Sequence, residues 1–423
     1  MQTDAEEQDL QGGGADPPPP TTAAVIVVCL SEILGVASYS IVPALLPQFL
    51  GAWSLSGTEG GWLAGMVFAG YMIAVLPLVS ITDRVPARTV YLAASVLNIV
   101  SCFGFAVADG LVVGLLFRAL AGISLAGTYM PGLRALTDGL DGARRARVSA
   151  CYTSSFTIGA SLSFLLGRAG TVYGWRTVFV AAGVLGIFAA GLAWRALPAG
   201  TPRPASDFRP LAGLFGVLQD REIVILIVGY VAVIWGSSGL RQWIVVFLTF
   251  CAGVGGETIG AAWWIAAAGV IINLLGVPAA FVGNELAIRF GLRPTAAWVF
   301  FASAIATGLF GLAAPLPLAG VVLLSLIAGF VVQGNFANLT TGLLAVAARQ
   351  RAGATMALYS SIGFGGGFAG TVTFGAILDY LGGAASAAAW ASAFASCGAV
   401  CLVGALAMAL LPRGIEHLEG GKA

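Results

Sequence analysis

Three ionisable side chains lie deep within long apolar stretches of the sequence. They are Glu32, Arg118 and Arg241. An ionised side chain in the hydrocarbon of a bilayer is costly unless it is paired or hydrated, so such residues mark binding sites and proton relays. We therefore expect these three side chains to line a central aqueous cavity and to form its binding or coupling site.

Glu32 lies about nine residues into the first apolar stretch, at a depth of roughly 13 Å for the rise of an α-helix. A carboxylate near the middle of a membrane can carry protons by repeated binding and release. Two other interpretations stay open at this point. One is a static ion pair with Arg118, and the other is exposure at a cytoplasmic mouth.

Arg241 lies in a glycine- and serine-rich part of its stretch, and Gln242 and Trp243 follow it directly. The planar guanidinium group binds a carboxylate or phosphate through two parallel hydrogen bonds. We therefore predict that Arg241, Gln242 and Trp243 contribute to an anion site. The alternative is an arginine whose long side chain reaches the outer interface.

Further polar side chains within the apolar stretches could complete this site. Each of them could instead form a contact between helices, which is a common role for such residues in membranes. The candidates are Gln333, Asn335, Tyr152 and Tyr359, followed by Tyr39, Tyr71, Trp263, Asn273 and Asn338.

The composition excludes most soluble functions. Of the 423 residues, 58% are hydrophobic and only 9% are charged, whereas soluble domains carry about 25% charged residues. A net charge of +1 provides no basic surface for nucleic acid. The only histidine, His417, lies near the C-terminus, which argues against Ser-His catalysis and histidine metal sites. We expect no enzymatic activity, no cofactor, no metal site and no nucleic-acid partner.

The apolar stretches are long enough to cross a bilayer, which takes about 20 apolar residues. Short polar interruptions separate them, and we predict one transmembrane helix for each. The twelve predicted spans are residues 23–50, 60–82, 89–108, 110–133, 148–167, 177–197, 223–250, 258–283, 294–314, 318–344, 354–378 and 385–411.

Basic residues are distributed unevenly between the predicted loops. With the N-terminus inside, the inner loops and chain ends hold 16 of the 20 Lys and Arg residues, while the outer loops hold only Arg168 and Arg176. This asymmetry follows the positive-inside rule. We expect both termini in the cytoplasm of a multi-pass plasma-membrane protein, located in the inner membrane of a bacterium.

The spans are predicted to form two domains. The proposed division is an acidic, proline-rich and disordered tail at 1–22, a six-helix bundle at 23–197, a cytoplasmic linker at 198–222, a second six-helix bundle at 223–411 and a cytoplasmic tail at 412–423.

The two halves also resemble each other in sequence. Similar segments at Arg84 and Arg289 are offset by 205 residues, and those at Tyr152 and Tyr359 by 207 residues. A repeat of about half the chain is typical of transporters built from duplicated helix bundles. The fold class is therefore an all-α integral membrane protein with two pseudo-symmetric six-helix bundles, which we expect to be a monomer.

Two short motifs accompany this arrangement. The loop after the second span reads Val79-Ser80-Ile81-Thr82-Asp83-Arg84-Val85-Pro86-Ala87-Arg88, and the fourth span contains Arg118-Ala119-Leu120-Ala121-Gly122. With twelve spans arranged as six plus six, they resemble the major facilitator superfamily. Its loop signature is G-x-x-x-D-R-x-G-R-R and its fourth-span signature is R-x-x-x-G. The resemblance covers residues 23–411.

The resemblance implies a gate at the inner loops. It assigns gating to Asp83, Arg84 and Arg88 in the first half, and the repeat assigns it to Arg289 and Arg293 in the second. The simpler interpretation of these arginines is positive-inside charge that only sets the orientation.

The predicted function is secondary active transport of a small solute by alternating access. Two intramembrane arginines against one glutamate favour an anionic substrate, and Glu32 favours proton coupling. A proton-coupled efflux pump for drugs or hydrophobic metabolites is the alternative, although Ser163-Phe164 stands where the antiporters of the superfamily have Gly-Pro. A non-transporting membrane receptor is a further alternative. The expected partners are the solute, protons and the lipid bilayer.

Overall fold

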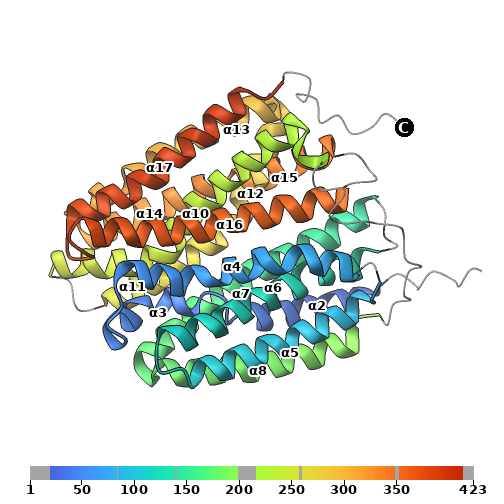
Figure 1. Ribbon diagram of the computed structural model, residues 1–423, viewed down its shortest axis with the longest axis horizontal. Coiled ribbons are helices and arrows are strands. Elements are labelled where there is room, and N and C mark those ends of the chain that lie inside the picture. Colours follow the sequence, from blue (N-terminus) through green and yellow to red (C-terminus); the bar gives the residue numbers. More distant parts are fainter. Residues whose placement is uncertain are drawn as a thin grey trace, which may run out of the picture.

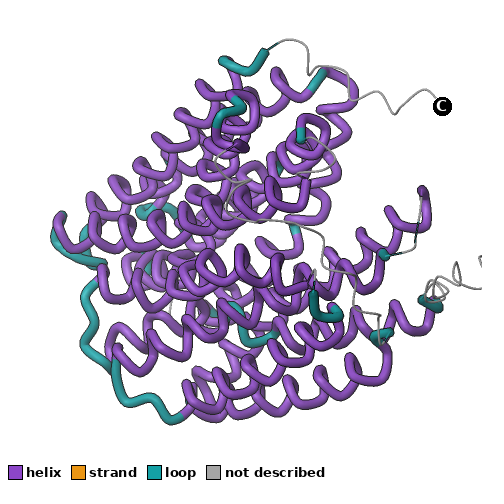
Figure 2. Tube along the Cα trace, turned by 45° about the vertical axis from the view of Figure 1, so that its right-hand side comes forward, coloured by secondary structure: helices purple, strands orange, loops and turns teal. Residues whose placement is uncertain are grey.

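The computed structural model describes residues 20–82, 84–138, 140, 142–198, 216–256, 260–347 and 352–412. Every regular element in these ranges is a helix, and Figure 2 shows helices joined by short loops. The predicted tails 1–22 and 412–423 and the linker 198–222 lie largely outside the described residues.

The helices follow the predicted spans closely. The first half contains α2 (Thr22–Val36), α3 (Ile41–Ala52), α4 (Gly57–Thr82), α5 (Ala87–Ala106), α6 (Leu111–Thr137), α7 (Gly142–Tyr173) and α8 (Trp175–Ala196). The second half contains α10 (Arg221–Val254), α11 (Ala261–Leu274), α12 (Gly276–Phe290), α13 (Leu292–Gly308), the 3-10 helix η1 (Phe310–Ala313), α14 (Leu318–Gln333), α15 (Asn335–Val346), α16 (Ala352–Tyr380) and α17 (Ala387–Ala409).

Eleven segments among the described residues are helical, long and apolar enough to cross a membrane. The remaining predicted span lies in α7, which is less apolar because arginines occupy its first turns and serines and threonines its middle. Its 32 residues extend over about 48 Å, and it packs against α2, α3 and α11. The fold confirms the predicted helical membrane architecture, with α7 extending from 142 to 173 rather than from 148 to 167.

Several spans are broken helices. Residues 37–40 separate α2 from α3, Leu275 separates α11 from α12, and Gly334 separates α14 from α15. Pro43 and Pro278 lie in the first turn after two of these breaks. Proline lacks a backbone N–H and therefore removes one hydrogen bond of the preceding turn. Transporters place binding sites at such discontinuous helices.

The two halves form two bundles that lie side by side. In Figure 1 the blue-to-green helices of the first half lie below the yellow-to-red helices of the second half. The main contacts between the bundles join α4 to α16 and α7 to α11. We call the end of the molecule that holds Pro20 and Pro412 the termini end, and the other the opposite end.

Glycines allow close approach of helices within the first bundle. A Cβ atom at Gly122 of α6 would overlap the carbonyl oxygen of Val67 in α4, and one at Gly70 of α4 would overlap that of Ala119 in α6. Small residues at such crossings permit the tight packing that stabilises helices in membranes. Gly122 is the glycine of the fourth-span motif, so the motif has a packing role here.

Replacing this glycine should destabilise the first bundle. We expect Gly122→Ala to lower the stability by about 1–3 kcal/mol, because the added methyl group forces α4 and α6 apart. Gly191→Ala in α8 is the matched control, since no neighbouring atom lies within 4 Å of its added Cβ. Thermal unfolding of the purified variants measures both effects. Equal melting temperatures would contradict the tight crossing.

Candidate functional site

Arg118 extends from α6 to the break in the first span. Because Pro43 has no N–H, the Tyr39 carbonyl lacks the donor that residue 43 supplies in a regular helix. Nη1 of Arg118 donates to this carbonyl at 3.1 Å. The arginine thus satisfies a backbone acceptor that hydrocarbon could not hydrate.

The other edge of the Arg118 guanidinium group makes no hydrogen bond to the part of the protein that the structure describes. The residue is 2% exposed, and its Nε and Nη2 have no hydrogen-bond partner among the described residues. These two nitrogens form the edge of an arginine that binds both oxygens of a carboxylate or phosphate. A buried charge without a partner is unfavourable, so this edge is suited to an anion.

Arg241 approaches the same region from the second bundle. It is partly buried in α10 and donates to Oδ1 of Asn273 in α11 rather than extending to an interface. Tyr39 lies within electrostatic range of both Arg118 and Arg241. The neighbouring Gln242 is buried, and its Oε1 has no partner in the part of the chain that the structure describes.

Glu32 is bound by tyrosines. Its side chain is 1% exposed, and Oε2 accepts hydrogen bonds from the hydroxyl groups of Tyr152 at 2.9 Å and Tyr91 at 3.4 Å. Oε1 has no partner within the described ranges. The guanidinium group of Arg118 binds Tyr39 instead, so neither a static Glu32–Arg118 pair nor exposure at a mouth matches this geometry.

A small cavity of about 30 Å³ lies inside the first bundle beside Glu32. Helices α2, α5, α6 and α8 enclose it. Apolar and polar groups both line it, and the polar residues include Ser31, Glu32, Ser38, Tyr91, Ser95, Asn98, Ser124 and Thr128. The volume is sufficient for one or two water molecules.

Trp243 lies apart from the arginine that precedes it. The side chain is fully buried in the core of the second bundle, stacks on Phe374 and donates from Nε1 to the Thr371 carbonyl at 3.1 Å. Successive helix residues point about 100° apart, so Arg241 and Trp243 need not share a surface. The structure therefore assigns the indole a packing role.

The polar residues of the tenth span stabilise breaks in the helices. Nε2 of Gln333 donates to the carbonyl groups of Ile272 at 2.9 Å and Gly329 at 2.7 Å. Nδ2 of Asn335 donates to the Ala296 carbonyl at 3.1 Å. Both side chains satisfy backbone acceptors, and the structure does not bring them together with Arg118 or Glu32.

The two predicted tyrosines have different surroundings. Tyr152 joins α7 to Glu32, and its hydroxyl group also lies 3.1 Å from the Thr128 carbonyl oxygen. Tyr359 stacks on Tyr230 within the second bundle, with ring centroids 3.9 Å apart. Only Tyr152 therefore contacts the buried carboxylate.

Two of the predicted gating arginines bind the ends of helices within their own bundles. Arg88 donates to the Trp194 carbonyl near the end of α8 at 2.5 Å, and Arg293 donates to the Ala409 carbonyl at the end of α17 at 2.6 Å. Cations stabilise the C-terminal end of a helix. The two contacts are equivalent under the repeat, because each joins the third span of a bundle to its last span, α5 to α8 and α13 to α17.

Two other predicted gating residues lie among the described residues. Arg289 pairs with Glu285 one turn earlier on α12, at 2.7 Å, and Arg84 is exposed. Asp83 lies outside the described residues.

The contact that closes the opposite end was not predicted. Asp379, in the last turn of α16, accepts from the backbone N–H groups of Gly57 at 2.6 Å and Thr58 at 2.7 Å, and from the Thr58 hydroxyl at 2.6 Å. Ser56 and Glu59 form a capping box at the start of α4, which leaves these two N–H groups free. Asp379 lies at the end of a predicted span, where charged residues are common, so no pattern singled it out.

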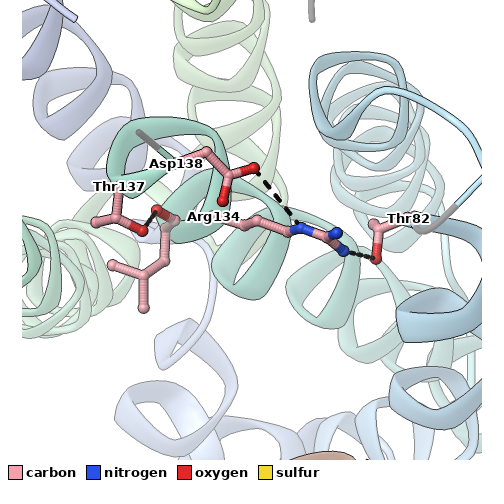
Figure 3. A network of polar contacts seen from close by, with 5 residues as sticks. Thr82, Arg134, Thr137 and Asp138 are labelled. Carbon is pink, nitrogen blue, oxygen red and sulfur yellow. Dashed lines mark hydrogen bonds and ion pairs between the residues drawn. The ribbon is translucent and has the colours of Figure 1, made fainter. Parts of the chain in front are cut away.

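The bundles diverge toward the termini end. A pocket of about 510 Å³ lies there between α4, α6 and α16, lined by Leu78, Ala126, Met130, Met356 and Ser360 among others. Arg134 also lines the pocket, donating to Thr82 at 3.3 Å and pairing with Asp138 at 3.8 Å (Figure 3). This volume falls within the range of small-molecule sites.

Comparison with known proteins identifies the family. The family description Major Facilitator Superfamily matches residues 28–371. The chain belongs to the major facilitator superfamily. Its fold and family make it a multi-pass membrane transport protein rather than an enzyme. No match was found among curated proteins.

Solved structures share this superfamily fold. A bacterial homologue of the human lysosomal transporter Spinster, in an inward-facing and unoccupied conformation, is 18% identical with a TM-score of 0.69, covering 94% of this chain and 96% of that one. A mutant of the nucleoside transporter NupG is 13% identical with a TM-score of 0.70, covering 92% and 99%. At these identities the likeness shows the fold alone.

Weakening the Asp379 contact should open the opposite end of this superfamily member. We expect Asp379→Asn to increase the population with separated bundles, because hydrogen bonds to a charged acceptor contribute about 1.5–3 kcal/mol each. Spin labels at the exposed residues Tyr173 and Ala385 would report longer distances between the bundles.

Asp109→Asn is the matched control for this measurement. Asp109 is exposed at the same end but pairs with Arg176 of its own bundle at 2.5 Å. Identical distance distributions for the two variants would show that Asp379 does not hold the bundles together.

Proposed function

We propose that this chain is a proton-coupled secondary transporter of a small anion that works by alternating access. The observation that carries the proposal is the buried guanidinium edge of Arg118, whose Nε and Nη2 have no partner among the described residues. An anion bound there would compensate a charge that is otherwise unpaired in a low-dielectric region.

Arg241 provides a second cation from the other bundle. Its neighbour Tyr39 is also within electrostatic range of Arg118. An anion held between α6 and α10 contacts both bundles, so its binding can favour one relative orientation of them over another. This is the requirement for a substrate that drives alternating access.

Glu32 is the proposed proton carrier. The titratable groups that face it are Tyr91, Tyr152, Tyr129 and Cys29, and no basic residue of the described ranges pairs with it. The Tyr152 hydroxyl lies within hydrogen-bond distance of both Glu32 and the Thr128 carbonyl. When Glu32 gains a proton, this hydroxyl can donate to Thr128 instead, which changes the link between α2, α6 and α7.

The proposed orientation of the protein in the membrane follows from the distribution of Lys and Arg residues between the loops. With both termini in the cytoplasm, the pocket at the termini end faces inward and Asp379 closes the outer end. This inward-open state does not determine whether the solute is taken up or exported, because alternating access passes through inward-open and outward-open states in both cases. We propose the bacterial inner membrane as the location and a monomer as the working unit.

Removal of either arginine should strongly reduce anion transport. In proteoliposomes we expect Arg118→Gln and Arg241→Gln to reduce counterflow of small carboxylates or phosphate by about 10-fold to 100-fold, since a charged hydrogen bond contributes about 1.5–3 kcal/mol. Arg176→Gln is the control, because Arg176 is exposed and pairs with Asp109. Flux of hydrophobic compounds but of no anion would instead favour the efflux alternative.

Removal of the Glu32 carboxylate should separate anion exchange from coupling to the proton gradient. We expect Glu32→Gln to retain anion exchange but to lose uptake driven by an imposed pH gradient, because the side chain can no longer bind and release a proton. Asp138→Asn serves as a carboxylate control at the mouth of the large pocket. Gradient-driven uptake that survives in Glu32→Gln would refute Glu32 as the proton carrier.

A further inference from the structure

The hydroxyl groups around the small cavity donate their protons to acceptors of the protein. Ser31 donates to the Ala189 carbonyl at 2.7 Å. Ser95 donates to the backbone carbonyl of Tyr91 at 2.9 Å, and Ser124 donates to that of Ala94 at 2.7 Å. The Ser38 hydroxyl donates to Oδ1 of Asn98 at 3.2 Å. The Ser31 oxygen also lies 3.1 Å from the Tyr91 hydroxyl. A hydroxyl oxygen has two lone pairs, so each of these four serines, all of which line the cavity, retains at least one for a ligand.

Glu32 also lines this cavity, and its Oε1 differs from its other carboxylate oxygen. Oε1 is buried and has no hydrogen-bond partner among the described residues, whereas Oε2 is held by Tyr152 and Tyr91. An ionised carboxylate without a cation is costly in a buried site. A proton removes the charge in one state of the transport cycle, and the deprotonated state needs another cation.

The break in the first span also favours a cation in this cavity. Gly35 and Val36 form the last turn of α2 and line the cavity. The C-terminal end of a helix carries a partial negative charge. Discontinuous transmembrane helices bind small cations at such ends in other transporters.

We propose that this cavity is a Na⁺ site, formed by Oε1 of Glu32 and the hydroxyl oxygens of Ser31, Ser38, Ser95 and Ser124. A single carboxylate suits a monovalent ion, because divalent cations require more negative ligands or more retained water. A volume of about 30 Å³ fits a small ion with at most one water molecule. The inference rests on the proposed exchange role of Glu32 and adds a second cation that competes with the proton.

The binding test uses thermal unfolding of the purified full chain. The protein is titrated with NaCl against choline chloride at constant chloride, with KCl as the comparison ion. Na⁺ should raise the melting temperature because a ligand that binds only the folded state stabilises it. The half-maximal Na⁺ concentration should rise at mildly acidic pH, since protons occupy Glu32, and K⁺ should produce no comparable shift.

Two serine variants provide a matched pair. Ser124 of α6 donates to Ala94 of α5, and Ser101 of α5 donates to Phe117 of α6, both at 2.7 Å, but only Ser124 lines the cavity. We expect Ser124→Ala to raise the half-maximal Na⁺ concentration about tenfold or more, Ser101→Ala to leave it unchanged, and Glu32→Gln to eliminate the response. The serine pair keeps the test decisive if Glu32→Gln does not fold.

Other results would overturn the site. An equal response to K⁺ and Na⁺, a retained response in Glu32→Gln, or equal effects of the two serine variants would each exclude it. Anion transport driven by a pH gradient without any Na⁺ effect would refute this inference and leave the proposed function intact. Na⁺ stabilisation through Glu32 without anion transport would refute the proposed function and leave the site.

Discussion

One hydrogen bond across the first bundle organises the candidate site. Pro43 removes a backbone donor from the first span, and Arg118 of α6 donates to the Tyr39 carbonyl in its place. Because hydrocarbon cannot satisfy this acceptor, the broken span depends on a cation from another helix. The same contact fixes the guanidinium plane and leaves its Nε and Nη2 edge without a protein partner among the described residues.

The break in the eighth span has a neutral side chain beside it. Pro278 lies in the first turn after the break between α11 and α12, and the amide of Gln333 donates to the Ile272 carbonyl. Ile272 lies two residues before Leu274, whose carbonyl lacks its usual helical donor because Pro278 has no N–H. An amide satisfies the backbone without a charge that needs compensation. Among the residues that the structure describes, the buried carboxylate and the small cavity beside it lie in the first bundle only.

The two cavities share α6 as a wall. Leu125 and Thr128 line the small cavity beside Glu32, while Ala126 and Met130 line the large pocket at the termini end. A cation bound in the small cavity and a solute in the large pocket would therefore act on opposite faces of one helix. Asp379 holds the opposite end closed in this state through the first turn of α4.

The sequence by itself determined the helical membrane architecture, because hydrophobic length and the scarcity of charge act locally along the chain. It also singled out Glu32, Arg118 and Arg241, since buried charges are costly wherever they occur. Only the tertiary structure decided their partners. Tyr91 lies 59 residues from Glu32 in the sequence, and Asp379 lies 321 residues from Thr58. Single hydroxyl and carboxyl groups carry no pattern that predicts such contacts. A site of one carboxylate and neutral oxygens leaves no cluster of acidic, histidine or cysteine residues in a sequence, because its ligands meet only when separate helices pack.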